Sequence, residues 1–254
     1  MRLLSAWEAS LESYHLRVMS LSKHLLSKLS AMIDLESVRE RARNILRTYR
    51  GQSIEDFYRF VVRAILSQNT TDRNAQRAFE RLEREGLLKP QNILKSPISK
   101  IAEAIEIAGM YNVRARVLRR LAFLFVKGGL ENLAAAIPSM GLEEARRALL
   151  SLPGIGLKTA DIILLFYFNK PVMPVDTHIQ RIAKRMGLVE KSARYEKIRE
   201  TLEQLVGPDP EKLLVVHLAL IEFGRNVCRA RNPLCKDCPF SSTCNYYINM
   251  FRKP

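Results

Sequence analysis

The chain has 254 residues, 47% hydrophobic and 26% charged, which suits an ordinary globular protein with room for two compact units. Its 41 Lys and Arg residues exceed its 26 Asp and Glu residues, which gives a formal net charge of +15. This surplus favours a polyanionic partner, nucleic acid ahead of an acidic membrane surface. No apolar run is long enough to span a bilayer, and the N-terminus lacks the apolar core of a signal peptide. We therefore expect an intracellular protein, in the cytoplasm or nucleoid, or in the nucleus of a eukaryote.

Apolar residues recur at helical spacing along nearly the whole chain, and we find no convincing strand. Residues 1–30 carry a heptad-like apolar stripe, which predicts an amphipathic helix on the body of the protein; a coiled-coil or partner-binding arm is the alternative. Helical patterns follow at 57–66 and around 118–125, and the run 213–221, apolar on all faces, predicts a buried helix. The sequence therefore predicts an all-α fold.

The stretch 152-LPGIGLKTAD-161 interrupts this pattern with a proline and two glycines. One helical pattern ends near Leu152 and another continues from 162, so the residues between them form a tight turn. Its unobstructed backbone N–H groups, next to a helix N-terminus, suit a phosphate oxygen, which makes Leu152, Gly154 and Gly156 candidate DNA contacts. A plain helix–helix connection is the alternative. We favour phosphate binding because an apolar residue separates the glycines and the chain is basic.

This stretch resembles the helix-hairpin-helix of DNA glycosylases in the endonuclease III group, and 174-PVDTHIQRIAKRMG-187 resembles that family's V-D-T-H segment. The resemblance implies that Lys158 and Asp176 are catalytic. A neutral amine can attack the sugar and form a Schiff base that permits β-elimination, and a carboxylate can stabilise the positive charge that develops. Taken singly, Lys158 could be a solvated lysine or a phosphate contact, and Asp176 a helix N-cap.

All four cysteines lie close together, in the pattern Cys228-x6-Cys235-x2-Cys238-x5-Cys244. In a reducing compartment, such a cluster favours a metal site over disulfides, and the spacing alone suits either zinc or a [4Fe–4S] cluster. The spacing resembles the C-terminal cluster loop of endonuclease III and the related adenine glycosylases, which implies a structural [4Fe–4S] cluster near DNA. The basic residues interleaved with the cysteines predict phosphate contacts, with a solvated basic loop as the alternative: Arg225, Arg229, Arg231 and Lys236.

Two further segments resemble parts of the family that open the duplex. In 66-LSQNTTDRNAQRAF-79, Asn69 takes the place of an intercalating glutamine; Gln68 is the alternative for that role, and both could instead cap adjacent helices. The segment 107-IAGMYNVRARVL-118 resembles the family's G-L-Y-N-x-K-A stretch, and its alternative is a helix turn with Tyr111 packed inside. Nearby arginines add charge that could follow a DNA strand: Arg114, Arg116, Arg119 and Arg120.

The resemblance spans about 35–246 and implies a helical architecture in two parts. A six-helix barrel over 53–166 would carry the hairpin, residues 31–52 and 167–254 would form the cluster domain, and 1–30 would be a separate extension. The implied function is that of a monomeric, bifunctional DNA glycosylase and AP lyase acting on damaged pyrimidines and abasic sites in duplex DNA. The alternatives are a mismatch or oxidised-purine glycosylase of the same family and a non-catalytic, metal-knot DNA-binding module.

Overall fold

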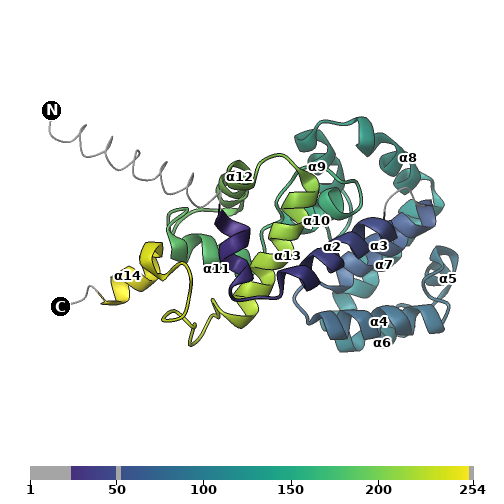
Figure 1. Cartoon of the computed structure of the whole chain (residues 1–254). Helices are drawn as coiled ribbons and strands as arrows, with labels where there is room; N and C mark the ends of the chain where they lie inside the picture. Colours follow the sequence, from purple (N-terminus) through teal and green to yellow (C-terminus); the bar gives the residue numbers. More distant parts are fainter. Residues whose placement is uncertain (1–23, 50–52, 252–254) are drawn as a thin grey trace. The chain divides into compact units, whose positions relative to one another are not determined.

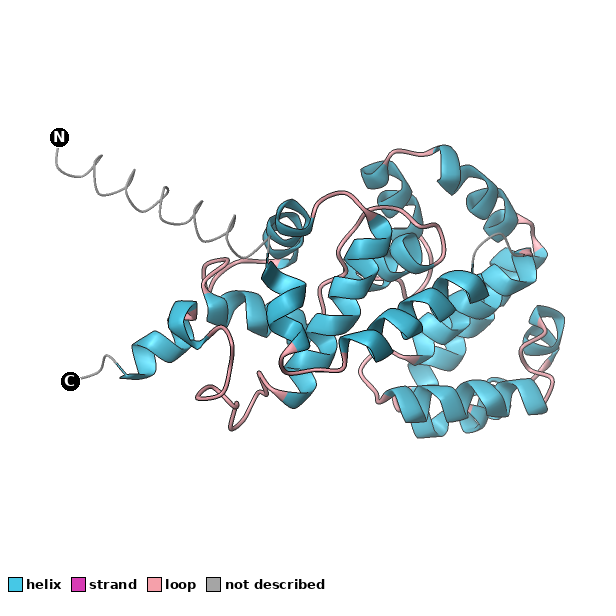
Figure 2. Cartoon of the chain, in the orientation of Figure 1, coloured by secondary structure: helices cyan, strands magenta, loops and turns pink. Residues whose placement is uncertain are grey.

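The computed structural model describes residues 24–49 and 53–251, and over these ranges it is built of helices joined by turns and loops (Figures 1 and 2). No strand occurs in these ranges, so the predicted all-α fold is confirmed. Most of the predicted extension at 1–30 lies outside the described residues; its last part, 24–30, is helical and buries Leu25 and Leu29.

Among the described helices, no single one is long and apolar enough to cross a membrane. One pair, Tyr111–Val126 with Gly129–Ser139, reaches the required length and composition only when taken together, and it is bent by 78°.

The chain divides into two compact units. Unit 1 consists of Met1–Ile45 and Pro171–Pro254, and unit 2 of Leu46–Lys170. The helices of unit 1 include α2 (Leu35–Tyr49), whose last residues belong to unit 2, and then α11 (Thr177–Met186), α12 (Tyr195–Val206), α13 (Pro210–Asn226), η3 (Ser241–Thr243) and α14 (Asn245–Phe251). Unit 2 contains α3 (Ile54–Leu66), α4 (Asp72–Arg84), α5 (Pro90–Lys95), α6 (Ile98–Ala104), η1 (Glu106–Ala108), α7 (Tyr111–Val126), α8 (Gly129–Ala136), η2 (Ile137–Ser139), α9 (Leu142–Leu150) and α10 (Leu157–Phe166).

Helix α3 is the central helix of unit 2 and contacts α4, α7, α8 and α10. It begins with a capping box, in which the Ser53 side chain accepts from the Asp56 amide while the Asp56 carboxylate accepts from the Ser53 amide. Apolar side chains on three sides of the helix are buried, which accounts for its central place: Phe57, Phe60, Val61, Val62, Ile65 and Leu66.

Helix α13 has the corresponding role in unit 1. Its residues within 213–220 are largely buried, as the all-round apolar pattern predicts, and it packs against α11 and α12. The close approach of α11 requires Gly224, because a Cβ at that position would lie 2.7 Å from the Cβ of His178. Phe223 packs edge-on against Phe240, which brings the cysteine-containing loop onto the end of α13.

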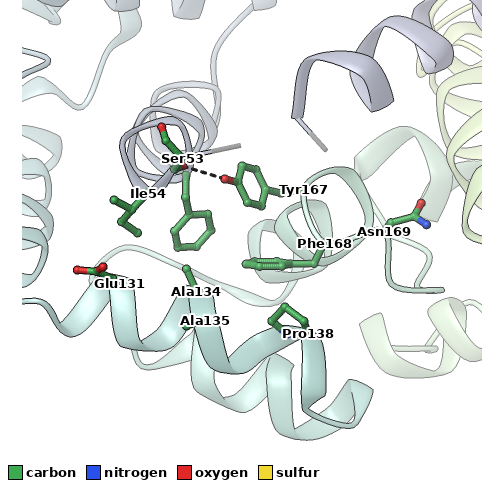
Figure 3. A pocket seen from close by; sticks show the side chains of 10 residues that line it. Ser53, Ile54, Glu131, Ala134, Ala135, Pro138, Tyr167, Phe168 and Asn169 are labelled. Atoms are coloured by element: carbon green, nitrogen blue, oxygen red, sulfur yellow. Dashed lines mark hydrogen bonds between the residues drawn. The ribbon is translucent and has the colours of Figure 1, made fainter. Parts of the chain in front are cut away.

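Unit 2 also contains an open hollow with an aromatic wall (Figure 3). Tyr167 and Phe168 line one side and α8 the other, and the Tyr167 hydroxyl donates to the Ser53 carbonyl at 3.2 Å. Phe57 also lines the hollow. None of the site residues predicted from the sequence lines this hollow.

Candidate active site and metal centre

The hairpin between α9 and α10 has the predicted helix–turn–helix form. Gly154 has φ +77°, and a Cβ there would lie 2.6 Å from Cγ1 of Val117, so both the backbone conformation and the space require glycine. Gly156 is the N-cap of α10, has φ −102°, and has open space where a Cβ would be. No side chain caps α10. A helix N-terminus without a side-chain cap is the kind of site at which backbone amides bind anions.

Leu152 and Ile155 anchor the turn from below, since both side chains are buried. Any contact of Leu152 with DNA would therefore use its backbone. Gly154 and Gly156 are exposed, as a backbone contact to phosphate requires.

Lys158 is the second residue of α10 and is half-buried, and Thr159 and Ala160 after it are buried. One turn later, the buried Asp161 accepts a hydrogen bond from Nε of Arg146 on α9 at 2.7 Å. Arg146 also reaches both carboxylate oxygens of Glu143, at 2.9 and 3.0 Å. This ion pair links the two helices of the hairpin, one turn after Lys158.

Gln68 and Asn69, which the sequence left as alternatives, have different surroundings. The Gln68 side-chain amide donates to the Gly154 carbonyl at 2.9 Å and to the Thr159 hydroxyl at 3.1 Å. Asn69 is exposed and has φ +50°. The alternative that these residues cap the adjacent helices is wrong, because Ser67 is the C-cap of α3 and Thr71 the N-cap of α4.

The arginines of the 107–118 segment and its extension do not all face solvent. Arg114 is 3% exposed and donates to the carbonyls of Gln68, Ala108 and Gly109, and burial lowers its pKa. Arg119 donates to the Ser96 carbonyl. These two side chains serve the fold instead of following a DNA strand, whereas Arg116 and Arg120 are exposed. Tyr111 is 38% exposed, so the alternative that it packs inside a helix turn is wrong.

Asp176 follows a buried segment without regular secondary structure, 172–175, that three side chains of unit 1 hold in place. The Glu203 carboxylate accepts a hydrogen bond from the Met173 amide at 2.9 Å. The Tyr195 hydroxyl accepts one from the Val175 amide at 3.3 Å. Nδ1 of His217 lies 3.0 Å from the Pro174 carbonyl oxygen. Asp176 itself is the N-cap of α11 and accepts from the Ile179 amide through Oδ1 at 2.8 Å.

The interpretation of Asp176 as a helix N-cap is therefore correct. This structural role is compatible with a catalytic role for the same carboxylate. A capping contact fixes the orientation of the carboxylate and occupies one of its oxygens. The residue is half-buried, and it belongs to unit 1 while Lys158 belongs to unit 2.

The four cysteines line one cavity in unit 1 together with Phe223, Phe240 and Tyr246. Burial is the main cause that raises the pKa of Cys238 to about 11, and the neighbouring thiols raise it further against a hydrogen bond from the Phe240 backbone. Burial, and then Cys228 and Cys244, also raise the pKa of Cys235. The thiols therefore influence one another electrostatically, and a metal must displace protons to bind them.

The four thiols share this one cavity. Within 24–49 and 53–251, no three His, Cys, Asp or Glu side chains are grouped tightly enough to hold a single metal ion. Four sulfur donors around a shared, aromatic-lined cavity have the chemistry of a thiolate-bound metal centre, either zinc or a [4Fe–4S] cluster.

Two arginines of α11 organise this loop, and sequence reasoning missed both. Arg181 donates to the carbonyls of Gly224 and Cys228 at 2.8 and 2.9 Å. Arg185 donates to the carbonyls of Arg229 and Ala230 at 2.6 and 3.0 Å, lies 3.6 Å from Cys228 Sγ and stacks on the Tyr246 ring. Their spacing places them on one face of the helix, which was the available signal.

The basic side chains predicted to contact phosphate all lie on the exposed part of the cysteine loop or beside it: Arg225, Arg229, Arg231 and Lys236. Their positions leave the loop both tied to α11 and cationic toward solvent.

Comparison with known proteins gives consistent relatives. The family model for HhH-GPD superfamily base excision DNA repair proteins matches residues 62–208. Endonuclease III of Thermotoga maritima is 34% identical over 212 residues, which is 83% of this chain and 93% of that protein. Endonuclease III of Sulfolobus acidocaldarius is 35% identical over 190 residues, 74% of this chain and 82% of that protein.

Solved structures share the fold. A trapped covalent endonuclease III–DNA intermediate and a non-covalent endonuclease III–DNA complex each match with a TM-score of 0.65 at 23% identity, covering 87% of this chain and 100% of theirs. A thermostable thymine-DNA glycosylase matches with a TM-score of 0.61 at 25% identity, covering 89% of this chain and 99% of that chain.

Proposed function

Because the chain belongs to the HhH-GPD superfamily of base excision DNA repair proteins and is a DNA glycosylase, we propose that it excises damaged pyrimidines and also cleaves the strand at abasic sites. It would act inside the cell as a monomer on duplex DNA. The observation that carries the lyase part of the proposal is the place of Lys158. A half-buried amine stands in the first turn of a helix whose N-terminal amides have no side-chain cap.

In the proposed reaction, Nζ of Lys158 in its neutral form attacks C1′ of the damaged nucleotide. The new N–C bond forms as the bond to the base breaks, and the base leaves with that electron pair and takes up a proton. Opening of the sugar ring gives a Schiff base. Loss of a proton from C2′ then expels the 3′ phosphate with the electron pair of its C–O bond, and water finally releases the lysine.

Asp176 would stabilise the positive charge that develops on the sugar and exchange protons with the amine. Its N-cap contact with Ile179 supports this role, since it leaves Oδ2 for that purpose and holds the carboxylate in one orientation. The buried segment before it, fixed by Glu203, Tyr195 and His217, restricts the backbone in the same way.

The hairpin amides around Gly154 and Gly156 would bind a backbone phosphate, and the basic residues of the cysteine loop would bind others. The two glycines of the hairpin are exposed, and no side chain caps the helix that follows them. The basic side chains of the cysteine loop are exposed as well. Such contacts position the duplex without reading its sequence, which suits an enzyme that must act at a lesion in any context.

We also propose that Cys228, Cys235, Cys238 and Cys244 hold a [4Fe–4S] cluster. The cluster would fix the loop that presents the basic side chains. Zinc, which four thiolates can also bind, is the alternative occupant. The purified protein should be coloured, with a broad visible absorption band that is lost on acid treatment; a colourless protein that contains zinc would contradict the assignment.

Borohydride trapping tests the lyase. Wild-type protein should form a covalent adduct with a duplex carrying one abasic site, and Lys158→Ala should abolish it. Lys100→Ala, which changes an exposed lysine on α6 of the same unit, is the matched control and should trap like the wild type. The lyase proposal is wrong if the wild type forms no adduct or if Lys158→Ala traps as well.

A second candidate is a mismatch or oxidised-purine glycosylase, and the exposed Asn69 favours keeping it. A short amide at this place would contact the base opposite the lesion differently from a glutamine. One structural relative, at 25% identity, is a thymine-DNA glycosylase. Single-turnover base release from a panel of duplexes, each with one lesion or mismatch, separates the two candidates.

A further inference from the structure

The side chain of Gln68 links two parts of unit 2 that are far apart in the sequence. It stands just after α3, and its Nε2 donates to the Gly154 carbonyl and to the Thr159 hydroxyl. The orientation of the amide is fixed by chemistry, since a carbonyl oxygen can only accept. One contact therefore holds the turn of the hairpin and the other holds the first turn of α10, next to Lys158.

The backbone of Gln68 is held as well. The buried Arg114 of α7 donates to the Gln68 carbonyl and, at 2.7 Å, to the Gly109 carbonyl. The residue that follows each carbonyl, Asn69 or Met110, is exposed and has φ +50°. The Arg114 guanidinium thus fixes the backbone immediately before each of these two exposed residues.

A third contact joins α7 directly to the hairpin. One turn along α7 from Arg114, Val117 lies against Gly154, so close that no Cβ fits between them. The hairpin, the start of α7 and the end of α3 therefore meet at Gln68, Arg114 and Gly154, all within unit 2.

We propose that Gln68 is a positioning residue, which sets the first turn of α10, and with it Lys158, relative to the exposed loop at Asn69. This inference rests on the proposed lyase function. Gln68 cannot hold the hairpin and enter a duplex at the same time, because leaving would deprive a buried hydroxyl and a carbonyl of their donor. The exposed Asn69 is the residue left to contact the DNA.

The test separates positioning from folding and from binding. In Gln68→Leu, which keeps most of the volume and loses both hydrogen bonds, the single-turnover rate of borohydride adduct formation at saturating abasic duplex should fall about 10-fold or more, since small misplacements of a reacting group have large effects. The Kd for a duplex with a reduced, uncleavable abasic analogue should stay within roughly 3-fold, because the phosphate contacts remain. Gln76→Leu on α4, whose amide donates to Glu80, is the matched control and should behave as wild type.

Two further measurements keep the inference falsifiable. Thr159→Val should lower the adduct rate on the wild-type background and add little to Gln68→Leu, because the pair acts through one contact. Amide hydrogen exchange over 152–160 should be faster in Gln68→Leu than in Gln76→Leu. If Gln68→Leu does not fold, Gln68→Glu, which replaces the donor with an oxygen facing a carbonyl, takes its place.

An unchanged rate in Gln68→Leu would overturn the inference, and so would equal losses of rate and affinity that follow a lower melting temperature. Absence of an adduct in the wild type would instead remove the lyase proposal. The hydrogen-exchange comparison then decides the positioning role by itself: equal exchange in the two variants would overturn it.

Discussion

Arg146 and Asp161 form an ion pair inside the hairpin, with Nε and Oδ1 2.7 Å apart and side chains that are 4% and 0% exposed. Removing one partner of a buried pair leaves the other charge without compensation, and this typically costs about 3–5 kcal/mol. We therefore expect Asp161→Asn to lower the free energy of unfolding by about 3 kcal/mol or more, measured by denaturant titration.

The control for this prediction is Glu143→Gln, which removes the other carboxylate that Arg146 contacts. Glu143 is 55% exposed, so the change should cost under about 1 kcal/mol. Equal losses in the free energy of unfolding of the two variants would show that burial does not increase the contribution of the Arg146–Asp161 pair to stability.

The two glycines of the hairpin should respond differently to alanine. Gly154→Ala combines a left-handed backbone with an overlap with Val117, and we expect a loss of about 2 kcal/mol or more in the free energy of unfolding. Gly156 has an ordinary φ and open space where a Cβ would be, so Gly156→Ala should change the free energy of unfolding by less than about 1 kcal/mol. Adding Val117→Ala to Gly154→Ala should recover the overlap part of the loss and leave the backbone part. Recovery of the whole loss would contradict the backbone contribution.

The helices and the hairpin could be predicted because their signals are local. Breakers at Pro153, Gly154 and Gly156 divide two apolar patterns within one short stretch, and the four cysteines lie in a single loop. The buried helix at 213–221 followed from an apolar run that no solvent-facing helix would carry.

Contacts between distant residues could not be predicted in this way. Whether Gln68 faces the hairpin, 86 residues later, or Arg185 faces Cys228, 43 residues later, depends on how helices pack, and periodicity does not carry that information. Arg114 and Arg119 were misread for the same reason. A positive charge in a basic chain suggests phosphate, yet backbone carbonyls at the ends of neighbouring elements bind both side chains.

Tyr58 predicts a dependence of stability on alkaline pH. Its hydroxyl is buried without a hydrogen-bond partner among the described residues, and burial raises its pKa well above the ordinary value near 10. Above about pH 10 the unfolded chain ionises this group while the folded chain keeps it neutral, so stability is retained below that pH and falls as the pH rises beyond it. Tyr58→Phe should reduce this slope.

At neutral pH, Tyr58→Phe should be neutral or stabilise by up to about 1 kcal/mol, because it removes a buried polar group that gains nothing in the fold. Tyr167→Phe is the comparison. Its hydroxyl donates to Ser53, and burial with a smaller effect of Asp56 raises its pKa to about 12. That variant should lose about 1 kcal/mol at neutral pH. Denaturant unfolding measured across the alkaline range checks this. If the stability of Tyr58→Phe fell with rising pH as steeply as that of the wild type, Tyr58 would not be the source of the pH dependence.

Asp176 allows its capping role and its proposed chemical role to be separated. Asparagine is as good an N-cap as aspartate, so Asp176→Asn should keep the contact to the Ile179 amide and leave the free energy of unfolding within about 0.5 kcal/mol of wild type. The same variant loses the negative charge, so base release and adduct formation should fall by about 100-fold or more if the carboxylate stabilises the developing charge. Asp176→Ala should lose both activity and about 1 kcal/mol of stability. Asp209 is the matched control, since it caps α13 through the amides of Glu211 and Lys212; Asp209→Asn should preserve stability and activity alike. An active Asp176→Asn enzyme would reduce Asp176 to a helix cap.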